Sequence, residues 1–335
     1  MCDNTYVKGV RVLPGSQTEN GKAFEYACLS AIHAALHLNE TVIIEDSPQL
    51  RTASNYFNNM SETAQNELIR AANAAVRVIV RLEPQMQYPE TNVPLYISIQ
   101  TDAQGIAGDV RDVLCVRRQN HWQIGLSCKH NHHAVKHSRL SDTIDFGLEW
   151  FGIPCSEQYF SEVVPLFSEL RRIRDNARNN DSPELWSTIP DKADRFYVPI
   201  LTSFLDELNR LTQTHPEVPS LLVCYLLGRF DFYKVTTDTQ HETTRVEAIN
   251  IAGTLNRPSG NHRSIVDVSR LHLPTRFYHT GFKQNSNNTI EVVCDVGWTI
   301  SMRIHNASSR VEPSLKFDVT LISLPNSIHA QVEPW

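Results

Sequence analysis

A stretch of strict alternation, WQIGLSCK at residues 122–129, constrains the fold of this chain most. Its apolar residues recur at every second position, which is the side-chain period of a β-strand with one buried face. The apolar run DVLCV at 112–116 precedes it, and the polar turn RRQNH at 117–121 joins the two, so the pattern predicts a β-hairpin. The alternation ends on Lys129, whose charge is costly to bury without a partner. The hairpin should therefore place a carboxylate beside Lys129.

Asp112 is the predicted partner of Lys129. With the turn centred between Gln119 and Asn120, residue 112 lies opposite residue 127, and a slip of two residues puts it opposite 129. Both registers bring the two charges together, because opposed and diagonal side chains on one face of a sheet interact. An aspartate, a hairpin and then a lysine two positions after a small acceptor outline the PD-(D/E)xK nuclease motif. That motif expects an acid where this chain has Ser127, so one metal ligand is missing locally.

Glu25 is a candidate for the missing acid. It lies in a predicted helix at 21–37, preceded by Asn20 as a plausible cap, on the same face as Leu29, Ile32 and Leu36. A carboxylate on a buried face needs a partner. A structural salt bridge would provide one. Alternatively, Glu25 joins Asp112 on a Mg²⁺ ion, which prefers one or two carboxylates and keeps several waters.

The same chemistry gives the other polar residues of the hairpin possible roles. Phosphodiester hydrolysis needs an activated water and stabilisation of charge on phosphorus, which a carboxylate-bound Mg²⁺ and a lysine supply. Lys129 would contact the scissile phosphate and the attacking water, and Ser127 would add a hydroxyl or simply be small. Asp109 is a further candidate metal ligand, and it also fits a turn or strand-entry aspartate after Gly108.

The charge of the chain is unevenly distributed. The net charge is −6, yet residues 109–139 hold six basic residues against two acidic ones, together with five histidines. A local basic site on an acidic body still attracts phosphate, so nucleic acid is a plausible partner. A solvated basic hairpin is the alternative reading.

The order of predicted elements indicates an α/β fold. Helices are predicted at 61–82, 156–180, 193–213 and around 219–228, and strands at 93–102 and in the hairpin. Beyond about residue 230 the pattern changes to β-branched and aromatic alternation. We therefore predict a nuclease core at 1–215, with a mixed central sheet flanked by helices and a catalytic hairpin at 109–131. A β-rich DNA-recognition region follows at 216–335.

The chain has the features of a cytoplasmic protein. Its longest strongly apolar run, at 220–228, is far shorter than the roughly 20 residues of a membrane-spanning helix, and its N-terminus has no apolar segment of signal-peptide type. Seven cysteines, an odd number without a CxxC pair, are expected to be reduced core residues.

Several long blocks of the sequence resemble the HaeIII-type family of type II restriction endonucleases. They are GDVRDVLCVRR, WQIGLSCKHNHHAVKHSRLS, IDFGLEWFGIPCSEQYF and GWTISMRIHNASSRVEPSLKFDV, within a similarity from about residue 21 to 325. The resemblance implies a Mg²⁺-dependent endonuclease of the PD-(D/E)xK superfamily that cuts double-stranded DNA at the palindrome GGCC. By that similarity Asp112 and Lys129 match the motif, Glu25 matches the helix-borne acid, and Ser127 departs from the pattern.

The resemblance also implies partners. A restriction enzyme is expected to work beside a DNA methyltransferase that modifies its site. A palindrome suggests a two-fold homodimer, and a monomer that nicks each strand in turn is the alternative. Other readings of the chain are a repair or structure-specific nuclease of the same superfamily, a catalytically inert DNA-binding module and a zinc hydrolase.

Candidate DNA contacts lie in the hairpin, in the block after it and near the C-terminus. Recognition of G·C pairs needs arginine or lysine donors to guanine O6 and N7. The residues predicted to contact DNA are Arg111, Asn131, His132, Lys136, His137, Arg139, Arg303, His305, Asn306 and Arg310. The histidine-rich block also permits a zinc site with Cys128, or a solvated turn. The NASSR segment at 306–310 also fits an ordinary loop.

Overall fold

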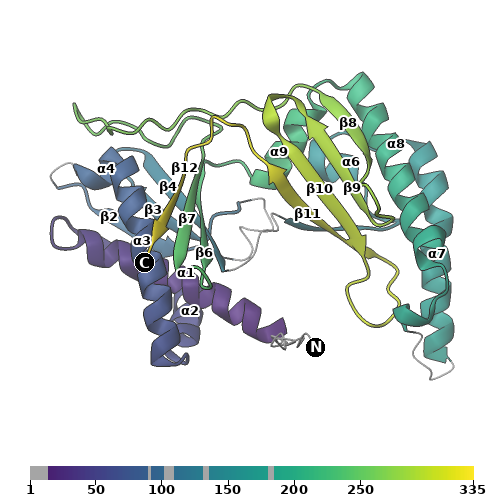
Figure 1. Cartoon of the computed structure of the whole chain (residues 1–335), viewed down its shortest axis with the longest axis horizontal. Helices are drawn as coiled ribbons and strands as arrows, with labels where there is room; N and C mark the ends of the chain where they lie inside the picture. The colour runs from purple at the N-terminus through teal and green to yellow at the C-terminus, as the bar shows by residue number, and fades with distance from the viewer. Residues whose placement is uncertain (1–13, 90–91, 102–108, 131–135, 180–184) are drawn as a thin grey trace, which may run out of the picture. The chain divides into compact units, whose positions relative to one another are not determined.

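The computed structural model describes residues 14–89, 92–101, 109–130, 136–179 and 185–335 (Figure 1). The chain forms two compact units, each assembled from separate stretches. Unit 1 contains Met1–His132, Asp231–Ser269 and His329–Trp335, and unit 2 contains His133–Phe230 and Arg270–Ile328.

Unit 1 is built on a mixed seven-stranded sheet. Its strands, in spatial order, are β1 (Val42–Ile44), β2 (Leu95–Ile99), β3 (Val113–Arg117), β4 (Trp122–His130), β6 (Phe232–Asp238), β7 (Thr243–Ile249) and β12 (Ala330–Pro334). The pairs β1–β2 and β4–β6 are parallel, and the other four are antiparallel. Parallel neighbours need a long crossover connection. The segment that connects β4 to β6 includes most of unit 2.

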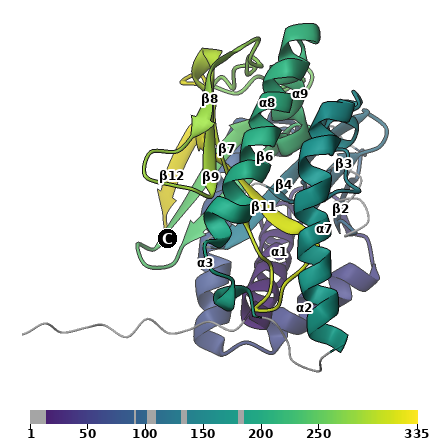
Figure 2. The same cartoon turned by 90° about the vertical axis from the view of Figure 1, so that its right-hand side faces the viewer.

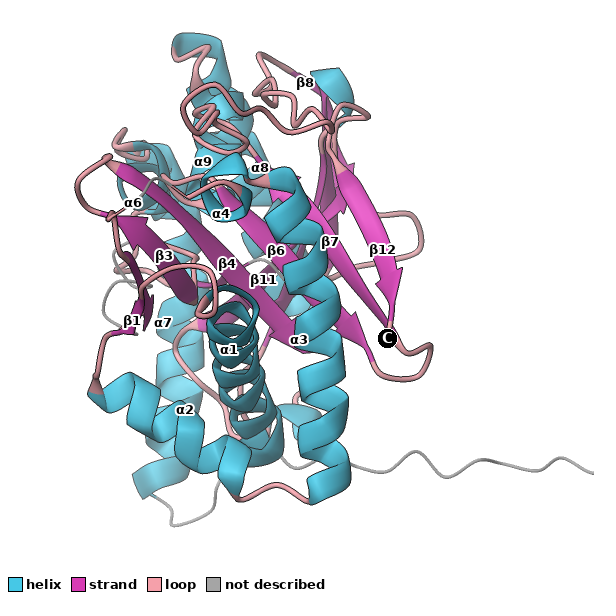
Figure 3. Cartoon of the chain, turned by 90° about the vertical axis from the view of Figure 1, so that its left-hand side faces the viewer, coloured by secondary structure: helices cyan, strands magenta, loops and turns pink. Residues whose placement is uncertain are grey.

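Helices cover one face of this sheet (Figure 3). They are α1 (Pro14–Leu36), α2 (Pro48–Asn58), α3 (Glu62–Leu82) and the short α4 (Pro84–Gln87). The apolar faces of α1 and α3 share one buried core with the inward side chains of the central strands. Ser61 caps α3, since its Oγ accepts from the amide of Ala64 at 3.3 Å. The prediction that Asn20 caps the first helix is wrong. The helix α1 begins at Pro14, a residue that is tolerated in a first turn, and Asn20 lies inside it.

Unit 2 combines an antiparallel five-stranded sheet with helices. The strands, in spatial order, are β5 (Lys136–Leu140), β11 (Leu315–Ser323), β10 (Thr299–His305), β9 (Thr289–Cys294) and β8 (Phe277–Phe282). The helices are α6 (Phe146–Phe151), α7 (Glu157–Asn179), a π-turn (Ala193–Tyr197), α8 (Val198–Thr214) and α9 (Val218–Leu227), with 3₁₀ turns at Trp186–Thr188 and Asp295–Gly297. Figure 2 shows the long helices α7 and α8. Phe317 of β11 packs on Trp150 of α6 and Phe204 of α8, so these helices cover one face of the sheet.

The fold class agrees with the prediction at the level of a mixed α/β chain with a β-rich C-terminal part. The compact units divide the chain differently from the expected boundary at residue 215. Strands β6, β7 and β12 belong to unit 1, because their backbones complete the sheet that contains the hairpin. Within the described ranges, no helix is both long enough and apolar enough to cross a membrane.

Candidate active site

The hairpin β3–β4 adopts the first of the two predicted registers. Val113 pairs with Leu126, and the amide of Asp112 donates to the carbonyl of Leu126 at 2.7 Å, so residue 112 lies opposite residue 127. Oδ2 of Asp112 accepts from the Cys128 amide at 2.6 Å and from Lys129 Nζ at 3.2 Å. The carboxylate predicted to accompany Lys129 is therefore Asp112.

The strand β4 is more buried than its alternation suggests. Gln123 is exposed on the polar face, but Gly125 and Ser127 are covered, and Ser127 is only 2% exposed. The Ser127 hydroxyl lies 3.4 Å from Oδ2 of Asp112, where the superfamily motif expects an acid. Ser127 is thus a buried neutral neighbour of the Asp112 carboxylate.

The charge of Lys129 is maintained by its surroundings. Burial alone would lower the pKa of Lys129, but the negative charge of Asp112 and the hydrogen bond to it outweigh burial, so the pKa is raised. Its side chain remains 29% exposed. Lys129 is therefore a cation at neutral pH with part of its surface open to a ligand.

Glu25 lies on the buried face of α1, as the helical period predicted, and is 6% exposed. Burial and, second to it, the negative charge of Asp112 raise its pKa to about 7, against the opposing charges of Lys22 and Lys129. Lys22 Nζ lies 3.3 Å from Oε2, which is the structural ion pair considered above. Because Glu25 also interacts electrostatically with both Asp112 and Lys129, it belongs to the same cluster of charges.

Asp109 and Arg111 form a buried pair next to this cluster. The Arg111 Nε and Nη2 atoms donate to the two Asp109 oxygens at 2.8 and 2.7 Å, and Gln100 Nε2 donates at 2.7 Å. Burial would raise the pKa of Asp109, but these hydrogen bonds and the Arg111 charge lower it. The geometry favours the strand-entry reading of Asp109. Arg111 is 5% exposed and its guanidinium is engaged by Asp109, so we leave it out of the proposed DNA contacts.

Gly125 is required by the position of Arg111. A Cβ atom at residue 125 would lie 2.2 Å from Cδ and 2.8 Å from Cβ of the Arg111 side chain, so Arg111 would have to move. The absence of a side chain on β4 therefore makes room for the Asp109–Arg111 pair.

We expect Gly125→Ala to destabilise the protein by about 2–4 kcal/mol, from overpacking and disruption of a buried ion pair. Chemical denaturation would measure this. Gly21→Ala is the matched control, because a Cβ there meets nothing within 4 Å and alanine favours a helix by roughly 0.5–1 kcal/mol. A Gly125→Ala protein as stable as the parent would show that Arg111 can move away.

No third acid completes a metal site in the described part of the chain. Among those residues, no group of three or more His, Cys, Asp or Glu side chains is arranged to hold a metal ion. The zinc alternative involved residues 131–135, which lie outside the described ranges, as do the predicted DNA contacts Asn131 and His132. His137, a further candidate zinc ligand, is instead hydrogen-bonded to Asp318.

Four of the predicted DNA contacts lie on one face of the unit 2 sheet. Ser138, Leu140, Phe317, Met302 and Ile304 point to the helices, so the alternate positions occupied by His137, Arg139, Arg303 and His305 point away from them. Asp318 of β11 lies among them, and the sequence analysis did not predict it as a site residue. Its only signal in the sequence was an acid at a polar position of the alternating strand LKFDV.

Lys136 does not point the same way. Its Nζ atom lies 3.2 Å from the Tyr225 carbonyl and 3.6 Å from the centroid of the Tyr225 ring, and burial lowers its pKa. Lys136 is therefore on the helix-covered face, and we leave it out of the proposed DNA contacts. Asn306 organises the following loop, since its Nδ2 donates to the carbonyls of Ser308 and Arg310, while the Arg310 side chain is exposed.

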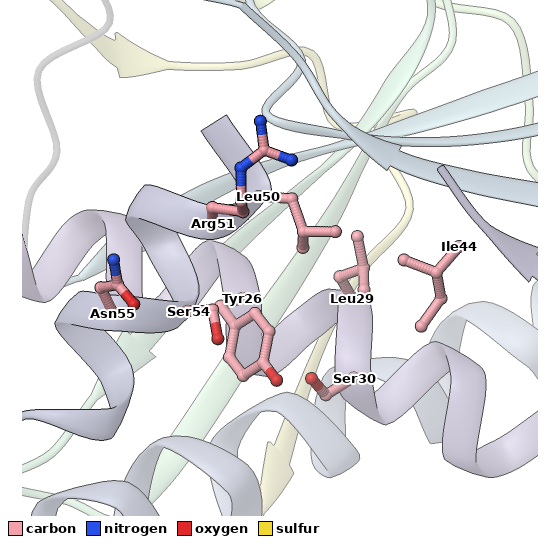
Figure 4. A pocket seen from close by; sticks show the side chains of 8 residues that line it. All are labelled: Tyr26, Leu29, Ser30, Ile44, Leu50, Arg51, Ser54 and Asn55. Carbon is pink, nitrogen blue, oxygen red and sulfur yellow. The ribbon is translucent and has the colours of Figure 1, made fainter. Parts of the chain in front are cut away.

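Unit 1 also has a pocket of about 350 Å³, whose lining includes none of Glu25, Asp112 and Lys129. It is lined by Tyr26, Leu29, Ser30, Ile44, Leu50, Arg51, Ser54 and Asn55, from α1, β1 and α2 (Figure 4). Its one charged side chain, Arg51, is paired with Asp46. The titratable candidates therefore lie in the hairpin and on the neighbouring face of α1, and not in this pocket.

The chain is similar to known proteins over nearly its whole length. Residues 21–325 match the family model for the HaeIII restriction endonuclease. Over 324 residues the chain is 37% identical to the type II restriction enzyme HaeIII of Haemophilus aegyptius, an alignment that covers 96% of this chain and 99% of that enzyme. No solved structure gives a significant match. The matched range includes residues of both units and every predicted site residue.

Proposed function

Since the chain belongs to the HaeIII restriction endonuclease family, we propose that Asp112, Glu25 and Lys129 form the catalytic centre of a Mg²⁺-dependent enzyme. The protein is a type II restriction endonuclease that cleaves double-stranded DNA at a specific site. One observation supports the proposed centre above all: the hairpin joins Asp112 to Lys129 at 3.2 Å, and the charge of Asp112 acts on the buried carboxylate of Glu25.

The donor set suits a magnesium ion. Two carboxylates close enough to raise the pKa of one of them repel each other, and a divalent cation would relieve that repulsion. Mg²⁺ is commonly bound through one or two carboxylates together with several waters. We assign Asp112 and Glu25 as its ligands and leave out Asp109, because Arg111 and Gln100 already occupy its oxygens. The Ser127 hydroxyl is the neutral group next to this pair.

The proposed mechanism uses the charges of these residues. A Mg²⁺ ion held by Asp112 and Glu25 would stabilise the negative charge that develops on the phosphoryl oxygens and would lower the pKa of a water. Lys129 donates hydrogen bonds to the scissile phosphate and orients the attacking water. Asp112 keeps Lys129 cationic throughout, so that its charge is in place before the transition state forms.

The arrangement is also consistent with a PD-(D/E)xK core. A helix-borne acid packs against a hairpin that carries the aspartate and the lysine, and the next strand of the sheet runs parallel to the lysine-bearing strand. We propose this superfamily assignment from the order and pairing of the elements.

We further propose that the exposed face of the unit 2 sheet recognises the DNA. Arg303 is exposed there, and Arg139, His137 and His305 lie on the same face. Arginine is the residue that most often reads guanine O6 and N7, which fits a site rich in G·C pairs such as GGCC. Arg310 extends the set from the adjoining loop. A homodimer would match the two-fold symmetry of that palindrome, and a methyltransferase that modifies GGCC would protect the host's DNA.

An assay of unmethylated plasmid DNA tests the proposed metal and site. With Mg²⁺ we expect discrete fragments whose mapped ends lie within GGCC, because the two carboxylates need a divalent cation to act. Excess chelator should abolish cleavage, and GGCC-methylated plasmid should stay intact. Fragments that end outside GGCC would reject the proposed site, and cleavage in chelator would reject the metal.

A further inference from the structure

A stretch of the sequence without acidic residues surrounds the edge strand β8 of unit 2. Residues 268–290 contain three arginine or lysine residues and two histidines but no aspartate or glutamate, in a chain whose net charge is −6. A local excess of positive charge favours an anionic ligand. The stretch includes the β8–β9 turn, residues 283–288, whose sequence KQNSNN has one lysine and four side-chain amides. This turn is the part of the stretch that is best placed to meet such a ligand.

The β8–β9 turn is fixed by its own hydrogen bonds. The amide of Ser286 donates to the carbonyl of Lys283 at 3.0 Å, and the Ser286 hydroxyl donates to Oδ1 of Asn288 at 3.1 Å. Asn285 has a positive φ of 60°, a turn conformation that asparagine tolerates better than most residues. The turn therefore has its shape before a ligand binds, which lowers the entropic cost of binding.

The outward side chains of the turn have donors to spare. Gln284, Asn285 and Asn287 are exposed, and their amides make no hydrogen bond with any residue that the structure describes. Lys283 is 49% exposed and lies 3.6 Å from Glu291, and such a surface ion pair contributes little to stability. Ammonium and amide groups both donate hydrogen bonds to phosphate oxygens in protein–DNA interfaces. The turn therefore offers one cation and several unused donors to a phosphate backbone.

Lys283 reaches the same face of the sheet as Arg303. The Nζ atom of Lys283 lies beside Glu291, whose register partner on β10 is Ser301. Ser301 and Arg303 are two residues apart on one strand, so their side chains point to the same side. Thr289, which follows the turn, pairs directly with Arg303. The β8–β9 turn thus continues the proposed DNA-binding face across β9 to the edge of the sheet.

We propose that the β8–β9 turn binds the sugar–phosphate backbone of the DNA, with a charge from Lys283 and hydrogen bonds from the amides of Gln284 and Asn287. Contacts to phosphate fix the orientation of a protein on the duplex and carry no sequence information. The turn therefore holds the duplex while Arg303 meets the base edges. This inference rests on the proposed function, in which this face of the unit 2 sheet binds DNA.

Two variants test the proposal, Lys283→Ala and the double variant Gln284→Ala/Asn287→Ala. Duplex affinity is measured in chelator, so that no cleavage occurs, at several salt concentrations. Each variant should bind about tenfold more weakly, the scale of one or two hydrogen bonds to a charged group. Lys283→Ala should also lower the slope of log affinity against log salt by about one, because one fewer counterion is released. The double variant removes no charge and should keep the slope of the parent.

Arg172→Ala is the matched control for Lys283→Ala. Arg172 is an exposed cation of α7 in unit 2, and it is also paired with a glutamate, Glu169, at 3.6 Å. Its substitution removes the same charge from a helix, so affinity and salt slope should both stay unchanged. Equal losses in Arg172→Ala and Lys283→Ala would reflect net charge alone and would overturn the contact. All the substituted side chains are exposed, so the variants should fold like the parent.

The outcomes separate this inference from the proposed function. If Arg303→Ala leaves the affinity for GGCC unchanged, the face does not bind DNA and both proposals fail. If Arg303→Ala weakens binding while Lys283→Ala or the double variant binds like the parent, only the turn contact is overturned. A non-cognate duplex completes the test: equal losses on both duplexes support a backbone contact, and a loss confined to GGCC would contradict it, because the turn would then read bases.

Discussion

Lys129→Ala should lower the rate of DNA cleavage by about a hundredfold to a thousandfold, while binding of the GGCC duplex stays within about a few-fold of the parent. The reason is that Lys129 stabilises charge that develops only in the transition state, and removing one such preorganised group costs about 10²–10³ in rate. Single-turnover cleavage with Mg²⁺ and duplex binding in chelator would measure the two quantities separately.

Lys234→Ala provides the control for this substitution. Lys234 is a half-buried lysine of the same sheet, on β6, and its amino group is held by Glu247 at 3.5 Å. The Lys234→Ala substitution removes the same charge, but two strands away from Asp112. Cleavage should therefore change by only about a few-fold. An active Lys129→Ala enzyme would exclude Lys129 from the chemistry. Equal losses in both variants would indicate a general effect of positive charge.

Glu25→Gln should have effects of opposite sign on activity and stability. Cleavage should be abolished, because an amide is a poor ligand for Mg²⁺ in place of a carboxylate. The metal-free protein should become more stable above pH 7, because the folded state no longer has to hold a charged group at a buried position. Urea unfolding in chelator, together with cleavage assays in Mg²⁺, would test both effects.

The sign of the stability effect follows from the pKa of Glu25. Folding raises it from 4.5 to about 7, so the folded state binds the proton more tightly than the unfolded state does. The resulting stabilisation is complete below pH 4.5, falls as the pH rises, and is lost above pH 7. The full shift corresponds to roughly 3 kcal/mol, an upper limit for the gain from glutamine at pH 8. The gain should shrink toward pH 5.

Glu83→Gln is a control for the Glu25 substitution. Glu83 is also buried in unit 1, and burial raises its pKa to about 7, but its partners are the Tyr233 hydroxyl and the Asn256 amide. Glutamine keeps the Oε1 acceptor that both of them use. This variant should therefore gain stability at high pH and keep its cleavage activity. If Glu25→Gln instead cleaves normally, Glu25 serves only the ion pair with Lys22.

Local periodicity accounts for the part of the site that could be predicted. The alternation at 122–129 and the length of the polar turn limit the hairpin to two registers, and both bring Asp112 beside Lys129, as the structure shows for the first of them. The 3.6-residue period of the first helix places Glu25 on its buried face. These features involve neighbours along the chain or a short turn, for which the side-chain period and the turn geometry leave few alternatives.

Long-range pairing decided the rest. The sequence by itself determined the hairpin, the main helices and the family resemblance. Only the tertiary structure showed that Arg111 is buried against Asp109, that Lys136 faces the helices, and that β6 joins the hairpin sheet. It also brought His137 to Asp318 across 181 residues. Strand partners so far apart are selected by the packing of whole sheets, and no local pattern specifies which face of a short polar strand meets that packing.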